Sequence, residues 1–233
     1  MASAYRLRNG DVGPVQQSPV TCGSACLTVA RMLVNPEFAR WITTGVGPRS
    51  DAPAGDTEQA RFAAYERVVM SRTNRLFAGG GRLNAPWPRA LGTPPWGARK
   101  ELEFGASRRG TQYELRVVRP LTKGRLREVH SRLVEVVADG EPALLYIGNA
   151  TLPRHVTLVL PGDGDRVLDV YDPATGQVTL LDEGRFADRK LRIAGWDVPW
   201  ITVQPNGIRT AQAFGFSTGI SSASRASGVS ASA

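Results

Sequence analysis

Closely spaced short apolar segments in the second half of the chain restrict its fold more than any other sequence feature. Each has the length and the apolar content of a strand. They span residues 143–147, 155–160, 167–171, 178–181 and 200–203, with a further alternating segment at 113–118. Turn-forming Gly, Asp and Pro residues fill the short links between them, and such links join antiparallel strands. The sequence therefore predicts an antiparallel sheet.

Helical periodicity dominates the first half of the chain. Residues 22–34 are apolar on nearly every side, which indicates a buried central helix that ends near Asn35-Pro36. Residues 57–77 and 123–138 each carry one apolar stripe, and a short helix is expected at 98–104. Helices followed by strands predict an α+β fold, in which an N-terminal helical part packs on a C-terminal antiparallel sheet.

Loops and the C-terminal composition set the expected domain limits. Residues 43–56 are rich in Gly, Pro and Asp, and residues 84–97 hold two tryptophans among four prolines. Both stretches are expected to be irregular, and the second is either a surface loop or a wall of a binding cleft. We expect a single domain over 1–205 and a disordered Ser/Ala/Gly-rich tail over 206–233.

The charge of the chain does not point to a particular partner. The net charge is +8, and nearly all of the positive charge is arginine. Basic residues neither form a long block nor alternate with aromatic residues, so a solvated basic surface is expected and nucleic acid is not the favoured partner. No apolar run is long enough to span a membrane, and the N-terminus lacks the apolar core of a secretory signal. We expect a cytoplasmic protein without a membrane association.

The two cysteines of the chain, Cys22 and Cys26, stand one helical turn apart at the start of the helix expected at 22–34. This spacing is poor for a disulfide, so two reduced thiols are expected. Cys26 is interpreted as a small buried hydrophobic residue, or else as a resolving thiol. Cys22 would lie at the helix N-terminus, where the helix dipole and free N–H groups favour a thiolate. The sequence thus predicts Cys22 as a nucleophile.

A thiol nucleophile needs a base, and the chain has two histidines. His130 lies between charged residues of the helix at 123–138 and is expected to be solvated. His155 opens a strand, and Asp172 ends the next one. If the two strands form a hairpin, these residues meet, and the carboxylate can orient the imidazole. The alternatives are a structural histidine at the strand edge and an aspartate that accepts bonds from its own turn.

A glutamine and the absence of metal motifs complete the expected site. Gln16 precedes Cys22 by six residues, and its side-chain amide and the Cys22 backbone N–H could together hold an oxyanion. The sequence contains no Cys/His/Asp/Glu cluster with metal-ligand spacing and no phosphate-binding loop. We therefore expect no metal and no cofactor.

These residues form two short blocks that resemble the C39-type cysteine peptidases. The blocks are Gln16-x5-Cys22-Gly23-x-Ala25-Cys26-Leu27 and Arg154-His155 with Tyr171-Asp172-Pro173-x-x-Gly176. Proteins of that family are papain-like domains of bacterial bacteriocin-processing exporters and their free-standing relatives. The resemblance implies Cys22 as nucleophile, His155 as base, Asp172 as orienting group and Gln16 as oxyanion donor, with a peptide or protein as substrate.

The chain departs from that family in two respects. Cys22 and His155 are farther apart than in compact members, so residues 43–110 are interpreted as an insertion. Thr21 replaces the acidic residue that often precedes the cysteine, so cleavage after a double-glycine leader is not implied. Three functions stay open: a thiol hydrolase acting on a peptide or isopeptide bond, an acyltransferase on the same scaffold, and an inactive basic binding module.

Overall fold

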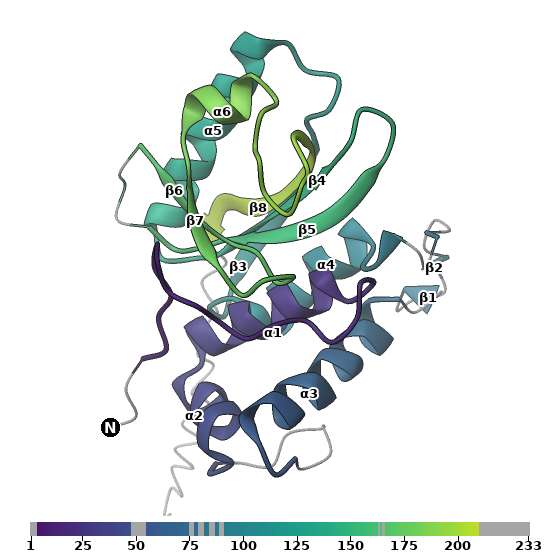
Figure 1. The fold of residues 1–233 in the computed structure, drawn as a ribbon, viewed down its shortest axis with the longest axis vertical. Helices are drawn as coiled ribbons and strands as arrows, with labels where there is room; N and C mark the ends of the chain where they lie inside the picture. The colour runs from purple at the N-terminus through teal and green to yellow at the C-terminus, as the bar shows by residue number, and fades with distance from the viewer. Residues whose placement is uncertain are drawn as a thin grey trace, which may run out of the picture.

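A computed structural model describes residues 4–47, 55–74, 77–78, 82–83, 87–88, 91–162, 164 and 166–209 of the 233-residue chain. A central sheet separates two helical layers (Figure 1). One layer holds the N-terminal helices, and the other holds two later helices. The α+β arrangement with an N-terminal helical part on an antiparallel sheet is thus confirmed, and the second helical layer adds to it.

The sheet has six strands, and each neighbouring pair is antiparallel. Its order is β3-β8-β4-β5-β6-β7. The strands are β3 (Thr111–Val117), β4 (Ala143–Gly148), β5 (Pro153–Val159), β6 (Leu168–Tyr171), β7 (Val178–Leu181) and β8 (Val198–Arg209). The final strand inserts between β3 and β4, which the short links alone could not indicate. A separate two-stranded pair joins β1 (Phe77–Ala78) and β2 (Arg82–Leu83).

The helices agree with the sequence periodicity at their centres and differ from it at some ends. They are α1 (Cys22–Val34), α2 (Pro36–Thr44), α3 (Glu58–Thr73), α4 (Pro95–Glu101), α5 (Lys123–Ala138) and α6 (Glu183–Ala187), and a π-helical turn over Leu102–Ala106 follows α4. The predicted stop at Asn35-Pro36 does end α1. It also begins α2, because proline is tolerated in a first helical turn and Asn35 Oδ1 accepts the Phe38 N–H at 3.0 Å.

Two expected boundaries need correction. Helix α4 begins at Pro95, so residues 95–97 are helical and not part of the irregular segment expected at 84–97. Strand β8 runs to Arg209 and pairs with β3, so residues 206–209 belong to the sheet and not to the expected tail over 206–233. The rest of that expected tail lies outside the described residues, as do 48–54 of the expected loop at 43–56 and residues 84–86 and 89–90 of the tryptophan-containing segment.

The alternation of side chains along β4 creates a core on each face of the sheet. Leu144 and Tyr146 pack with α1 and α3 in one core, whereas Leu145 and Ile147 pack with α5 in the other. Helix α1 lies between the sheet and α3 (Figure 1). This position explains why the helix is apolar on nearly every side, and it holds the first residue of α1 against the sheet.

His130 is buried, so the prediction that it is solvated is wrong. Its side chain is 2% exposed, its ring centroid lies 5.8 Å from that of Phe186, and its Nε2 atom is 3.2 Å from the Leu181 carbonyl oxygen. Burial lowers the pKa of His130, against the opposing effect of the Leu181 carbonyl. The periodicity of α5 could not show this, because α6 covers a side of the helix that is polar in sequence.

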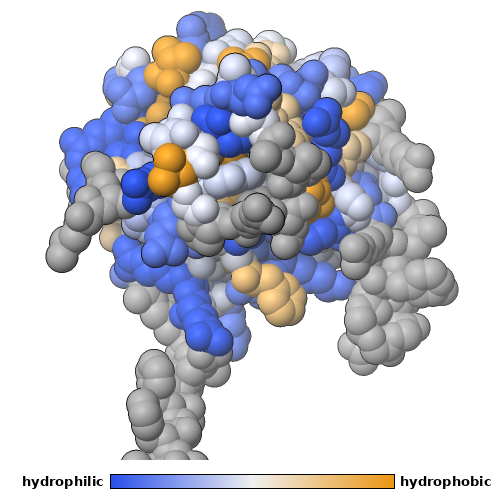
Figure 2. All heavy atoms as spheres, turned by 90° about the horizontal axis from the view of Figure 1, so that it is seen from below, coloured by the Kyte–Doolittle hydropathy of each residue, from blue (hydrophilic) through white to orange (hydrophobic). Residues whose placement is uncertain are grey.

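The outer face formed by α2 and α3 is mostly hydrophilic, with apolar side chains in small separate groups (Figure 2). Within the described ranges, no helix combines the length and the apolar character needed to cross a bilayer.

Candidate active site

Cys22 is the first residue of α1, and its side chain is 2% exposed. No side chain caps the start of this helix. Thr21 instead closes the preceding turn, since its hydroxyl donates to the Ser18 carbonyl at 2.8 Å and accepts the Ser18 N–H at 3.2 Å. Among the residues that the structure describes, no side chain accepts the backbone N–H groups of the first turn of α1. Such a helix start favours negative charge on a nearby sulfur.

His155 and Asp172 are in direct contact. The His155 Nε2 atom lies 2.7 Å from Asp172 Oδ1, and both side chains are 6% exposed. The antiparallel register of β5 and β6 pairs Leu158 with Tyr171. Continued by one residue, this register sets Asp172 opposite Thr157, which is two positions from His155 and on the same face of β5. Asp172 also accepts the Ala174 N–H at 2.9 Å and the Thr175 hydroxyl at 3.1 Å. The aspartate therefore both orients the imidazole and stabilises its own turn.

The electrostatics of this pair favour the charged forms. Burial by itself would lower the pKa of His155, but hydrogen bonds to Asp172 and to Cys22, with the charges of both groups, raise the pKa to about 9. Burial would likewise raise the pKa of Asp172, but the bonds from His155 and from the Ala174 N–H hold it below its usual value. Because Nε2 contacts the aspartate, Nδ1 is the ring nitrogen left for the Cys22 thiol.

Gln16 is fixed beside this pair, although its side chain has a local partner. Its backbone N–H donates to the Pro173 carbonyl at 2.8 Å, next to Asp172. Its side-chain Nε2 donates to the Ser18 carbonyl at 2.8 Å, and its buried Oε1 has no partner among the described residues. A primary amide carries two N–H groups, so Ser18 occupies one and the other is available. The oxyanion role of Gln16 stays a prediction.

Gly92 and Thr93, from the segment expected to be irregular, form a wall against the thiol. Gly92 has φ of +71°, and a Cβ atom there would lie 2.9 Å from the Val20 carbonyl oxygen and 3.6 Å from Cys22 Sγ. Thr93 is held by the Tyr146 hydroxyl, which donates to its carbonyl at 3.0 Å. A Cβ atom on Gly23 would come within 2.6 Å of the Thr93 side chain. Glycines at 23 and 92 are therefore what allows the wall to close on the helix start.

The wall residues were missed as individual site residues by sequence reasoning, which suggested only that the whole segment could line a cleft. The local signal is the Gly92-Thr93 pair between two tryptophan-proline motifs. Nothing in that pattern points to Cys22, because the contact joins residues about 70 positions apart and depends on the path of a long loop.

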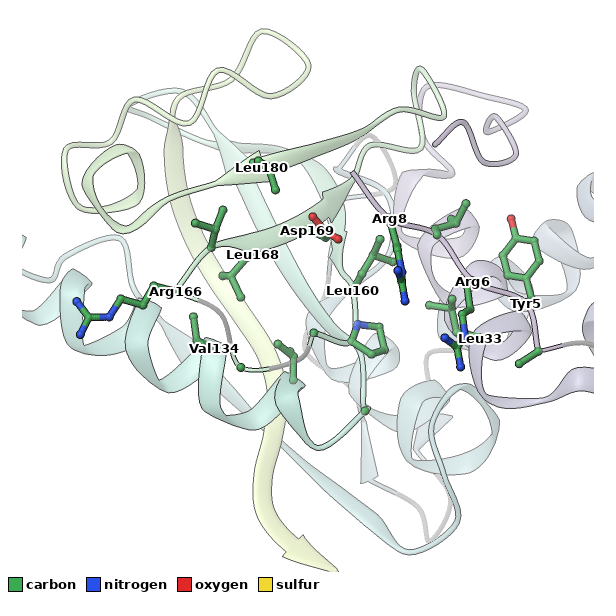
Figure 3. Close-up of a pocket in the computed structure, with 18 of the residues that line it drawn as sticks. Tyr5, Arg6, Arg8, Leu33, Val134, Leu160, Arg166, Leu168, Asp169 and Leu180 are labelled. Carbon is green, nitrogen blue, oxygen red and sulfur yellow. The ribbon is translucent and has the colours of Figure 1, made fainter. Parts of the chain in front are cut away.

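A cavity of about 810 Å³ lies elsewhere in the molecule. It is lined by the N-terminal segment, by the end of α1 at Leu33, and by Leu160 and Arg166 of the β5–β6 turn (Figure 3). Because Cys22 and His155 are at the opposite ends of α1 and β5, this cavity is separate from the thiol. Within the ranges that the structure covers, no group of three or more His, Cys, Asp or Glu side chains could hold a metal ion.

Comparisons with known proteins include a likeness to a solved structure. No protein-family model and no curated protein matches the sequence. Among solved structures, the chain is similar to the peptidase domain of Streptococcus ComA, which is described as a bi-functional ABC transporter involved in a quorum-sensing pathway. The two are 15% identical over 83% of this chain and 97% of that one, with a TM-score of 0.37. At that level the likeness assigns no role to any residue of this chain.

Proposed function

We propose that this protein is a thiol hydrolase that cleaves a peptide or isopeptide bond. Cys22 would be the nucleophile, His155 the base, Asp172 the group that orients the base, and Gln16 an oxyanion donor. The observation that carries the proposal is the 2.7 Å contact between His155 Nε2 and Asp172 Oδ1, because it directs Nδ1 to a thiol at the start of a buried helix. A histidine with only a structural role would not need both a carboxylate and a thiol as partners.

The reaction would proceed through a thioester. The Cys22 sulfur, having given its proton to His155, attacks the carbonyl carbon of the substrate, and the carbonyl oxygen becomes an oxyanion. The second N–H of the Gln16 amide and the Cys22 backbone N–H would stabilise that charge. His155 then protonates the departing amine. In the second half, His155 removes a proton from water, which attacks the thioester and releases Cys22.

The family and the domain limits belong to the same proposal. The cysteine at the start of a central helix, the histidine at the start of a strand and the aspartate at the end of the next strand follow the order of a C39-like, papain-like peptidase. The residues up to Arg209, where β8 ends, would then form the catalytic domain, with an insertion around 43–110 that supplies the wall at Gly92. A cytoplasmic location and a peptide or protein substrate are further parts of it.

An acyltransferase on the same scaffold is the second candidate. The observation that favours it is the 2% exposure of Cys22 beneath the wall, because a thioester shielded from water reacts more readily with a bound amine or thiol. Trapping the acyl-enzyme and offering it water alone or water with an amine distinguishes the two. Turnover that is unaffected by the amine would exclude transfer.

The proposal is tested by the reactivity of the two thiols. Iodoacetamide at neutral pH should alkylate Cys22 much faster than Cys26, and His155→Ala should remove the difference. A peptide library analysed by mass spectrometry should be cleaved by the wild-type protein and not by Cys22→Ala. Slow and equal alkylation of both thiols, without cleavage, would leave the inactive basic binding module as the better description.

A further inference from the structure

Glu66 is a buried carboxylate that the chemistry above does not use. It lies on α3 and is 0% exposed, and its side chain points to the loop before Cys22. The Gln17 backbone N–H donates to both of its oxygens, at 3.3 Å to Oε1 and 3.2 Å to Oε2. Gln17 directly follows the expected oxyanion donor. A residue of α3 thus holds the backbone next to Gln16 through a bond that spans 49 positions of sequence.

The same carboxylate faces the other end of this loop. Burial raises the pKa of Glu66, while the nearby Thr21 side chain and the hydrogen bond from the Gln17 N–H oppose that rise. Thr21 is the residue before Cys22. Glu66 therefore bonds to the residue after the glutamine and lies near the residue before the cysteine, the two positions whose N–H groups would bind the oxyanion.

The loop is held from a second side by the turn after β6. The Gln16 N–H donates to the Pro173 carbonyl at 2.8 Å. This bond fixes the loop relative to Asp172, whereas Glu66 fixes it relative to α3. With a single anchor the loop could rotate about it, and the direction of the Gln16 amide would then vary.

A purely structural explanation does not account for a carboxylate here. Among the residues that the structure describes, no ion pair joins Glu66 to a lysine or an arginine. Arg67 acts on Glu66 through its charge without forming an ion pair. Burying a carboxylate without a directly bonded cation is costly, and an apolar side chain of similar volume often packs at least as well. What a carboxylate adds at this position is a strong acceptor for the Gln17 N–H.

We propose that Glu66 is a positioning residue of the thiol site, which holds the loop over residues 16–21 so that the Gln16 amide and the Cys22 N–H face the same point. The inference rests on the proposed hydrolase function. It concerns the step in which an oxyanion forms, and it does not concern formation of the nucleophile.

The test compares Glu66→Met, which keeps the length of the side chain without a strong acceptor, with Glu66→Gln, which keeps an acceptor oxygen. Glu66→Met should slow peptide cleavage about tenfold to a hundredfold through kcat, in the range expected when an oxyanion donor is lost or misplaced. Glu66→Gln should stay within about threefold of wild type, because its amide oxygen still accepts the Gln17 N–H. Alkylation of Cys22 by iodoacetamide should be unchanged in both variants, since that reaction develops no oxyanion.

A matched control is available on the same helix. Glu58 is a second glutamate of α3, and its side chain is exposed. Glu58→Met should leave cleavage and alkylation unchanged. Cleavage by Glu66→Met at the wild-type rate would overturn the inference. So would parallel losses of cleavage, Cys22 alkylation and melting temperature, which would indicate a structural role only.

Failure of the underlying function has a different signature. In that case the wild-type protein itself would neither cleave peptides nor show selective alkylation at Cys22. If Glu66→Met does not fold, Glu66→Ala takes its place, and the ratio of kcat to the rate of Cys22 alkylation should fall about tenfold or more. A fall in both by the same factor in that variant would overturn the inference.

Discussion

The Nε2 atom of His155 lies 2.7 Å from the Oδ1 atom of Asp172, although 17 positions separate the two residues in sequence. The contact arises because β5 and β6 pair as antiparallel neighbours with Leu158 opposite Tyr171, so that Asp172 lies one residue beyond the paired end of β6 and near the face of β5 that carries His155. It leaves Nδ1 as the ring nitrogen that is free to interact with Cys22, which also acts on the pKa of His155. Most of the expected behaviour of the site depends on this arrangement.

Replacing Asp172 by asparagine should remove most of the activity while leaving the fold intact. Asparagine keeps the shape but favours the wrong imidazole tautomer and no longer stabilises the imidazolium, so kcat should fall about 10²- to 10⁴-fold. Steady-state cleavage and circular dichroism measure the two effects. Thr175→Ala removes one bond to the same carboxylate, at 3.1 Å, and should cost much less. Equal losses in the two variants would contradict the orienting role.

The raised pKa of His155 predicts a loss of stability at alkaline pH. The folded-state pKa is about 9, above the value near 6.5 of an unfolded histidine, so the folded protein binds the proton more tightly. This contribution to the free energy of unfolding is complete below about pH 6.5 and is lost as the pH rises through about 9. It amounts to roughly 3 kcal/mol, from the difference between the two pKa values.

Urea unfolding of the wild-type protein and of His155→Asn between pH 6 and pH 10 checks this prediction, with the pH range taken around the two pKa values. The wild type should lose stability across the interval, and the variant should show a much smaller slope. Identical slopes would mean that other groups, such as the buried tyrosines, set the alkaline limit.

Gly92→Ala should lower the reactivity of the Cys22 thiol by more than its effect on stability explains. An alanine at φ of +71° is strained, by about 1 kcal/mol, and its Cβ atom would crowd the Val20 carbonyl oxygen at 2.9 Å. Relief of that contact must move the wall or the start of α1, so alkylation of Cys22 should slow several-fold.

Gly195→Ala is the matched control for the backbone strain. Gly195 has φ of +78°, and a Cβ atom there would have nothing within 4 Å. This variant should lose comparable stability while Cys22 keeps its reactivity. If both variants alkylate at the wild-type rate, the segment around Gly92 does not control access to the sulfur.

Cys26→Ala should retain the activity. Cys26 is 0% exposed, its thiol contacts the Val156 carbonyl oxygen at 3.4 Å, and burial raises its pKa well above the usual value. It should therefore stay protonated and unreactive, and its loss should cost about 1 kcal/mol of stability from the removed sulfur. Cleavage assays and chemical unfolding measure both. A loss of oxidant sensitivity in this variant would instead support a resolving thiol.

The sequence by itself determined the local elements of this protein. The periods of 22–34 and 123–138 predicted α1 and α5, and the short turns between apolar segments predicted an antiparallel sheet. The short turn between β5 and β6 also predicted that His155 and Asp172 lie close together, because such a turn fixes which parts of the two strands are neighbours. These features depend on neighbours within a few positions or on one hairpin, so a single sequence contains them.

Only the tertiary structure decided which of the other residues surround the thiol or lie in the core. The burial of His130 under α6, the wall at Gly92 and the contact of Glu66 with Gln17 each join segments far apart in sequence. Periodicity reports the polarity of one element, whereas burial depends on what packs against it. These contacts come from the packing of loops and helices on the sheet, and no local pattern encodes that packing.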